Sequence, residues 1–365
     1  MKIQDIISYL EILAPSSLQE SYDNTGLLTG NADWKCSGII TTLDVTEAVV
    51  AEAIENNYNL IVAHHPIIFS GLKKLTGKNY VEKTVIKAIK NDIAIYAIHT
   101  NLDNVIDGVN GAMADKLGLI NRNILRPKKG VLKKLVIFVP TADSENLQNS
   151  LFNAGAGNIG KYSECSFSLE GKGMFKAGAN TNPFVGKIGE RHTENEIRVE
   201  VIYPDWNEKV ILQAMHTAHP YEEVAHDIYL LDNKLQDVGS GLFGELSEAI
   251  SEMEFLFKLK NAFNLSLIRY TPLLGKQVKK IALCGGAGSS LINDAVESGA
   301  NFYITGDVKY HEFFDANDKV VIADIGHYES EQYTIDLLFN NLSKKFPNFA
   351  VLKTRVKTNP VNYYV

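Results

Sequence analysis

The sequence contains few cysteines and no long apolar segment. Its three cysteines, Cys36, Cys165 and Cys284, are far apart and form no C-x-x-C pair, which argues against a disulfide scaffold and suits a reducing compartment. No stretch approaches the ~20 consecutive apolar residues that a membrane-spanning helix needs. Residues 1–13 mix charged and apolar side chains, as an amphipathic helix does and a signal peptide does not. We therefore expect a cytoplasmic protein with no membrane segment.

Blocks of like charge and internal repeats are also missing. The formal net charge is −7 and no basic stripe runs along the chain, so a nucleic-acid-binding surface is not expected. Hydrophobic residues make up 45% and charged residues 22% of the sequence, the proportions of an ordinary globular protein with a sizeable core. A chain of 365 residues fits two or three domains.

Apolar runs of strand length alternate with amphipathic helical stretches over residues 1–127, and the pattern returns over residues 237–365. This alternation predicts parallel strands with helical crossover connections. The simplest architecture is a doubly wound α/β core interrupted by an inserted module. We expect helices at 3–13, 47–57, 81–90, 108–117, 290–298 and 329–345, and strands at 37–44, 59–63, 93–98, 280–284, 301–305, 320–324 and 350–355.

A different pattern occupies the middle of the chain. Residues 121–130 are polar and basic and contain Pro127, which predicts a linker. Residues 132–235 then have the pattern of strand, helix and strand twice over, the order of a ferredoxin-like α+β module. The glycine-rich centre, Gly171–Gly189, predicts a loop or a loosely paired hairpin. The predicted domains are the first half of a core at 1–127, an insert at 128–236 and the second half of the core at 237–365.

One candidate metal-binding segment is His64-His65-Pro66, which follows a predicted strand. Neighbouring side chains on a strand point to opposite faces, and the proline biases His65 toward extended backbone. The two imidazoles can therefore point toward separate ions. Taken alone, a solvent-exposed histidine pair at a turn is the simpler interpretation.

Two further segments carry the same residue types. His99 and Asp103 follow another predicted strand; such an Asp is commonly a helix cap, and His99 fits a supporting residue better than a ligand. His327 and Glu331 have the i, i+4 spacing that places both on one helix face within ~6 Å. That pair can hold one ion, or its carboxylate can bridge two ions, but an ordinary polar helix face has the same spacing.

The three segments share one feature that favours a common metal site over a different explanation for each segment. Each segment lies at the carboxyl end of a predicted parallel strand, where open α/β sheets bind ligands. Histidines and carboxylates brought together there can hold metal ions, which activate water and neutralise charge on a phosphate or leaving group.

Three other parts of the core are weaker candidates for contact with a substrate. The turn at Gly285–Gly288 precedes a predicted helix, and its amides can hold a phosphate, although a plain tight turn explains it equally well. Asp44, at the end of the first strand, is a candidate hydrogen-bond partner for a ligating histidine or for substrate. Lys309 and His311 are candidates for substrate contact, and a capped turn explains their segment nearly as well.

The insert contains a group of histidines and glutamates that resembles a second metal site in composition only. The group straddles a helix end, a proline and a strand, so nothing in the sequence brings it together, and we predict no site there. Its members are His216, His219, His226, Glu222 and Glu223.

Six segments in their order along the chain resemble the GTP cyclohydrolase 1 type 2 homolog family, also known as the Nif-three-like dinuclear metal proteins. The resemblance extends over nearly the whole sequence. The segments are Tyr22-Asp23-Asn24-Thr25-Gly26-Leu27-Leu28, His64-His65-Pro66, His99-Thr100-Asn101-Leu102-Asp103, Gly239 to Leu246, Thr305-Gly306-Asp307-Val308-Lys309-Tyr310-His311, and Gly326-His327-Tyr328-Glu329-Ser330-Glu331.

The resemblance implies a core of parallel-rich sheets flanked by helices, interrupted by an insert related to PII and CutA proteins. It also implies a toroidal homohexamer whose sites face an internal cavity. A dinuclear centre would have Glu331 touching both of its ions, and imidazole and carboxylate ligands together favour Zn, Mn or Fe over Mg. The ligands that the resemblance implies are His64, His65, Asp103, His327 and Glu331.

The family name implies ring opening of GTP with loss of formate, a hydrolysis that a dinuclear site can support. We therefore expect a metal-dependent hydrolase of a nucleotide or a related phosphorylated small molecule. The alternative is a non-catalytic regulatory or binding protein in which the metals assemble the site and the PII-like insert senses a ligand.

Overall fold

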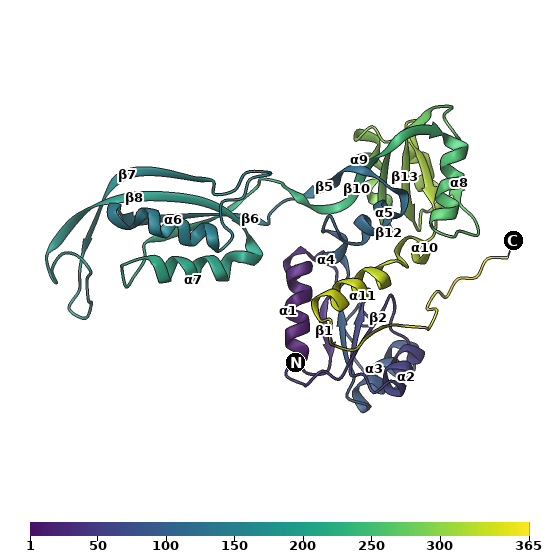
Figure 1. Cartoon of the computed structure of the whole chain (residues 1–365), viewed down its shortest axis with the longest axis horizontal. Coiled ribbons are helices and arrows are strands. Elements are labelled where there is room, and N and C mark those ends of the chain that lie inside the picture. The colour runs from purple at the N-terminus through teal and green to yellow at the C-terminus, as the bar shows by residue number, and fades with distance from the viewer. Residues whose placement is uncertain (365) are drawn as a thin grey trace. The chain divides into compact units, whose positions relative to one another are not determined.

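A computed structural model describes residues 1–364 and divides the chain into two compact units. Met1–Pro127 and Asp237–Val365 together form the core, and Lys128–Gln236 form the insert. Both units combine helices with strands (Figure 1). No helix within residues 1–364 is both long and apolar enough to cross a membrane.

The first sheet of the core has the strand order β1-β4-β3-β2-β15. All neighbours are parallel except β1, which pairs antiparallel with β4. Strands β2, β3 and β4 are completely buried, because α1 and α11 cover one face of the sheet and α2 and α3 cover the other. The bounds are α1 Ile3–Leu13, β1 Gly26–Thr29, β2 Ile39–Thr42, α2 Glu47–Glu55, β3 Leu60–Ala63, α3 Tyr80–Lys90, β4 Ala94–Ala97, α11 Thr334–Lys345 and β15 Val351–Lys353.

The second sheet of the core has the order β11-β14-β13-β12-β10-β5. Strands β12, β13 and β14 are parallel, whereas β10 and β11 run antiparallel to their neighbours β12 and β14. Helices α5 and α8 pack on one face and α9 on the other. The bounds are α5 Val109–Leu117, β5 Ile120–Lys128, β10 Leu235–Ser251, α8 Glu252–Ala262, β11 Arg269–Tyr270, β12 Gln277–Ala287, α9 Ile292–Glu297, β13 Phe302–Gly306 and β14 Val321–Asp324.

Short helices join several of these elements. Helices α4 and α10 carry site residues, and the remaining five are single 3₁₀ turns or short 3₁₀ segments. The bounds are η1 Ser16–Leu18, α4 Thr100–Asp103, η2 Thr141–Asp143, η3 Asp205–Asn207, η4 Ser289–Leu291, η5 Tyr310–Ala316 and α10 His327–Glu331.

The insert is a four-stranded antiparallel sheet in the order β7-β8-β6-β9 with both helices on one face. Along the chain its elements follow the order β-α-β-β-α-β, which is the ferredoxin-like arrangement. The predicted relation to PII and CutA proteins stays a prediction. The bounds are β6 Leu132–Pro140, α6 Ser144–Asn153, β7 Ser166–Lys176, β8 Arg191–Pro204, α7 Glu208–Ala218 and β9 His226–Leu231.

The predicted linker at 121–130 was wrong. Residues 120–128 form β5, an edge strand of a second sheet, and most of its side chains are exposed or only partly buried. Its neighbour β10 was missed because glycines interrupt its apolar pattern. Gly239 is required there, since a Cβ at this position would lie 2.1 Å from the Arg126 carbonyl oxygen in β5.

The predicted helix at 329–345 is two helices, α10 and α11. The side chains at the break turn toward the end of α8: the Gln332 amide donates to the Phe263 carbonyl (3.4 Å), and the Tyr333 hydroxyl donates to the Ala262 carbonyl (3.2 Å). The glycine-rich stretch of the insert is also divided, because its first residues continue β7 as far as Lys176 and only the rest is a loop.

Candidate metal centre

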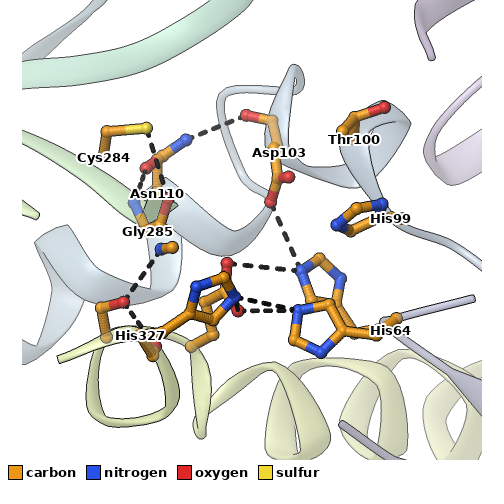
Figure 2. Close-up of polar contacts among 12 residues, drawn as sticks. His64, His99, Thr100, Asp103, Asn110, Cys284, Gly285 and His327 are labelled. Carbon is orange, nitrogen blue, oxygen red and sulfur yellow. Dashed lines mark hydrogen bonds and ion pairs between the residues drawn. The ribbon is translucent and has the colours of Figure 1, made fainter. Parts of the chain in front are cut away.

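Side chains from both sheets of the core meet in one place (Figure 2). The first sheet supplies His64 and His65, which follow β3, and Asp103, the last residue of α4 after β4. The second sheet supplies His327 and Glu331, the first and last residues of α10 after β14. The donor atoms form overlapping groups, and within each group they all lie within 4.8 Å of one another.

The inner donor cluster consists of His64, Asp103 and Glu331. Nε2 of His64 lies 3.7 Å from Asp103 Oδ1 and 3.7 Å from Glu331 Oε1. Nδ1 of His64 lies 2.9 Å from the Ile98 carbonyl oxygen. Because a carbonyl only accepts hydrogen bonds, Nδ1 carries the proton, and a neutral His64 turns the lone pair of Nε2 toward the two carboxylates.

The inner cluster has the electronic character of a cation site. Among residues 1–364, His64 Nε2 and Asp103 Oδ1 are buried without any hydrogen-bond partner. Buried polar atoms are otherwise nearly always paired, and a nitrogen lone pair that faces two carboxylates is repelled by them. A cation placed among these atoms removes both penalties, so the residues present fit a bound metal ion.

The outer donor cluster consists of His65, His327 and Glu331. Glu331 Oε2 lies 3.0 Å from His65 Nε2 and 3.1 Å from His327 Nε2, and the two Nε2 atoms are 3.4 Å apart. Each Nδ1 faces its own carboxylate, Asp44 at 2.8 Å and Asp307 at 2.7 Å. A carboxylate behind an imidazole fixes the ring and leaves Nε2 as the donor, the usual arrangement of metal-binding histidines.

Glu331 is common to both clusters, with Oε1 directed to the inner one and Oε2 to the outer one. Its side chain is almost completely buried. The space that it occupies exists because residue 286 is glycine: a Cβ on Gly286 would lie 2.3 Å from Glu331 Oε1, and φ at Gly286 is +62°. Both the space and the backbone conformation therefore require glycine.

The charges in the site shift its pKa values strongly. Burial lowers the pKa of His65, but hydrogen bonds with Asp44 and Glu331 outweigh it and raise the pKa to about 10. The same balance raises the pKa of His327 to about 9. Burial and the neighbouring Glu331 raise the pKa of Asp103 to about 7. Burial opposes ionisation of Glu331, yet hydrogen bonds from the imidazoles hold its pKa well below the usual value. The arrangement thus favours positive charge at its centre.

His99 forms a third donor group with His64 and His65, and it is held by a residue that the sequence reasoning did not select. Its ring centroid is 5.2 Å from that of His64 and 5.3 Å from that of His65. His99 Nδ1 lies 2.8 Å from Asp23 Oδ1. Burial opposes ionisation of Asp23, but hydrogen bonds from His99 and Thr100 lower its pKa to about 2. The sequence signal for Asp23 was its position in the segment Tyr22–Leu28. That segment contributed to the family resemblance, but the resemblance gave Asp23 no role.

Asn110 connects the two sides of the site (Figure 2). Its side-chain amide donates to the Asp103 carbonyl (3.0 Å), and its side-chain oxygen accepts from the Gly285 amide (2.9 Å). Asn110 therefore ties the end of α4 to β12 and keeps Asp103 in register with the residues of the second sheet.

A cleft of about 820 Å³ opens over the donor clusters. Aromatic residues Tyr22, Phe69, Tyr328 and Tyr363 are among those that line it. Chain beyond β15 also borders the cleft: the Thr358 hydroxyl donates to Asp44 Oδ2 (2.7 Å). The carboxylate that orients His65 is thus held from its other side by this segment.

The glycine-rich segment Gly285–Gly288 at the end of β12 makes a poor phosphate site, because its glycine amides already donate to side chains. Gly286 N donates to Ser330 Oγ (2.9 Å), and Gly288 N donates to Thr305 Oγ1 (2.9 Å). The amide of Gly285 is taken by Asn110, as described above. The turn serves instead to make room for Glu331.

Among the remaining candidates from the core, Asp44 contacts the site and Lys309 and His311 do not. Asp44 forms the predicted hydrogen bond to a candidate ligand, His65. Lys309 and His311 are exposed and do not line the cleft; Asp307 from the same segment reaches the site instead. In the insert, both ring nitrogens of His219 bond to backbone atoms, and within residues 1–364 no metal-binding group includes an insert histidine.

Comparison with known proteins identifies the family. The model of the family described as Duf34/NIF3 (NGG1p interacting factor 3) matches residues 1–360. The chain belongs to the DUF34/NIF3 family. Family membership agrees with the resemblance seen in the sequence.

Curated relatives in this family match the chain from end to end. A GTP cyclohydrolase 1 type 2 homolog of Halalkalibacterium halodurans is 39% identical over 365 residues, with 99% of this chain and 98% of the relative covered. A protein of the same name from Bacillus subtilis is 37% identical, with the same coverage.

Solved structures in this family have the same fold. The crystal structure of a Bacillus cereus protein related to NIF3 superposes with a TM-score of 0.86 at 38% identity, covering 100% of this chain and 99% of that one. The expected core of parallel-rich sheets flanked by helices is therefore confirmed.

Proposed function

We propose that this DUF34/NIF3 protein binds two divalent metal ions and uses them to hydrolyse a nucleotide or a related phosphorylated small molecule. The observation that carries the proposal is the position of Glu331, whose two oxygens face separate donor clusters. One ion belongs to the inner cluster and the other to the outer cluster, with Glu331 shared between them. Mixed imidazole and carboxylate donors favour Zn, Mn or Fe.

The chain's own residues prepare the site for this chemistry. Asp44 and Asp307 each hold one proton on Nδ1 of His65 or His327, so Nε2 is the nitrogen that each ring would offer to an ion once the second proton has left. A pair of bound divalent ions supplies an activated water and neutralises negative charge on a phosphate or leaving group.

The cleft suits a molecule with a planar ring. The rings of Tyr22 and Phe69 lie side by side with centroids 6.5 Å apart, and both are well exposed. The Phe69 ring lies 6.4 Å from His99, so this aromatic pair adjoins the donor clusters. A nucleobase stacked on the pair would place the rest of a nucleotide within the cleft of about 820 Å³.

The remaining parts of the proposal come from the resemblance of the sequence to the family. We propose a toroidal homohexamer whose sites face an internal cavity, and a cytoplasmic location. Light scattering on the purified protein tests the assembly, because a hexamer of 40.4 kDa chains differs about sixfold in mass from a monomer.

The test combines metal analysis with a substrate screen. The protein is stripped of metal, reconstituted with Zn, Mn or Fe, and assayed by elemental analysis for metal content. It is then incubated with GTP, other nucleotides and phosphodiesters. We expect about two ions per chain and turnover of at least one compound.

A matched pair of variants controls the screen. His64→Ala should lose turnover, whereas His311→Ala, which changes an exposed histidine away from the cleft, should keep it. A well-metallated protein that turns over none of these compounds would show that the hydrolase proposal is wrong.

A regulatory protein is the second candidate function. The observation that favours it is a separate cavity in the insert, about 580 Å³ in volume. Deleting residues 132–235 distinguishes the two functions. A hydrolase keeps turnover after the deletion, and a regulator has no turnover with or without the insert.

A further inference from the structure

The insert contains a cavity of about 580 Å³ that none of the proposed chemistry uses. Strands β7 and β8 provide its floor, on the face opposite helices α6 and α7, whose core contains Ile197 and Val199. Two loops, 177–190 and 219–225, close over this floor. The loops are tied together where Asn182 N donates to Glu222 Oε1 (2.9 Å).

The floor of the cavity has room for one buried carboxylate. Glu196 in β8 pairs across the sheet with Gly171 in β7, and Gly173 follows two residues later on the same face. A Cβ on Gly173 would lie 2.0 Å from Glu196 Oε2. The glycine therefore leaves the space that this carboxylate occupies.

The Glu196 carboxylate lacks a cationic partner within the protein. Only 8% of the residue is exposed. The Tyr221 hydroxyl donates to Oε1 (3.2 Å), but within residues 1–364 no group donates to Oε2, and no Lys, Arg or His forms an ion pair with Glu196. Burial raises the pKa of Glu196, as expected for an acid whose charge is not compensated.

Aromatic rings line the cavity that contains this carboxylate, and one of them, Tyr221, contacts it. The Tyr221 ring lies 6.2 Å from the Phe175 ring and 6.2 Å from the Phe184 ring, so Tyr221 adjoins both. His219 supports Tyr221 from behind at 5.0 Å. Ring faces attract cations, and several rings around one negative charge form the arrangement that binds organic ammonium groups.

The basic residues near the cavity are directed elsewhere. Lys172 and Lys176 alternate with Gly173 and Phe175 along β7, so their side chains leave the opposite face of the strand. Arg198 is paired with Glu200 at 2.9 Å. Lys172, Lys176 and Arg198 do line the cavity, but neither lysine shares a strand face with Glu196 and Arg198 is already paired.

We propose that this cavity binds a small organic cation, with the ammonium group between the rings of Phe175, Phe184 and Tyr221 and beside Glu196. The ligand class is that of quaternary or protonated amines, and the site is separate from the metal centre. Its occupation depends on neither the metals nor any hydrolysis.

The test is calorimetric titration of the full-length protein with choline, using its uncharged isostere 3,3-dimethylbutan-1-ol as the matched probe. We expect saturable binding of choline at concentrations below ~10 mM and at least about tenfold weaker binding of the isostere, because cation–π attraction in a partly desolvated cage supplies that difference. Equal binding of the two compounds, or no saturable binding of choline, would overturn the proposal.

Variants locate the site. Glu196→Gln keeps the shape of the side chain and should weaken choline binding about tenfold. Glu145→Gln, which changes an exposed residue of α6 outside the cavity lining, should leave binding unchanged. Phe184 is 59% exposed, so Phe184→Ala should fold normally and still weaken binding severalfold. Choline binding that survives both Glu196→Gln and Phe184→Ala would place the ligand elsewhere and refute the assignment.

Discussion

The two donor clusters of the core are built from the same residue types but differ in how the imidazoles are held and how far water reaches them. The His64 side chain of the inner cluster is 0% exposed, whereas those of His65 and His327 in the outer cluster are 20% and 38% exposed. A backbone carbonyl fixes the inner ring, and carboxylates fix the outer rings.

This difference shows two ways of preparing a histidine for a metal. The inner cluster leaves His64 Nε2 and Asp103 Oδ1 buried and unpaired among residues 1–364, so a cation relieves a penalty that folding has already imposed. The outer cluster keeps its nitrogens paired with Glu331 and reachable by water. We therefore expect the inner ion to bind more tightly and the outer ion to exchange more readily.

The largest effect should come from Glu331→Gln, which removes the charge that both clusters share. Both ions should be lost, with affinity falling by more than the ~100-fold that removal of an outer partner causes. Elemental analysis after dialysis measures the loss. Glu329→Gln is the matched control, because Glu329 lies on the same short helix and outside both clusters. Retention of two ions by Glu331→Gln would contradict a shared carboxylate.

Single histidine variants should separate the clusters. His64→Ala should remove the inner ion and leave about one ion per chain, and His327→Ala should remove the outer ion instead. Titration of each stripped variant with metal gives the affinity of the cluster that remains. If either substitution removes both ions, the binding of one ion depends on the other. The affinities of the two clusters then cannot be compared separately.

A smaller effect is expected from Asp307→Asn. The amide no longer fixes the proton of His327 on Nδ1, so the affinity of the outer ion should fall by ~10–100-fold while the inner ion is retained. Competition with a chelator measures both affinities. Asp315→Asn in η5, an exposed residue outside the clusters, serves as the control. An equal loss from both clusters would argue against a local role for Asp307.

A final prediction concerns pH and involves no change to the chain. The pKa values of His65 and His327 are raised to about 10 and about 9, so both rings are protonated at neutral pH in metal-free protein and an entering ion must displace those protons. Affinity for the outer ion should therefore rise with pH up to about pH 10, by about tenfold per unit for each ring that is still protonated. Titrations in buffers of different ionisation enthalpy count the protons, and no proton release at pH 7 would contradict the shifted values.

The sequence predicted those parts of the core that depend on local pattern. Helix α1 and the buried strands β2, β3 and β4 were located closely, because continuous apolar runs between helical stretches are typical of parallel strands covered on both faces. Strands β5 and β10 were not located, since a mostly polar edge strand that contains a proline and a strand interrupted by glycines both resemble a connecting loop in sequence.

The sequence indicated the histidines and carboxylates that meet in the site, but it did not indicate most of the residues that hold them in place. Each candidate ligand followed a strand, which was enough to expect that they meet. Asp23 and Asp307 were missed because their roles depend on contacts with residues 76 and 20 positions away. The role of Gly286 was left open between a phosphate-holding turn and a plain tight turn, since no local pattern shows that a distant glutamate needs its empty space.

The adjacency of β5 and β10 has a consequence for how such a protein can be rebuilt. These neighbouring strands lead into and out of residues 128–236, and because Gly239 lies against Arg126 while Gly244 lies against Ile120, they run in opposite directions. Chain leaving one strand can return along the other through a tight turn. The insert can therefore be exchanged for a different module at this position without changing the sequence of the rest of the chain.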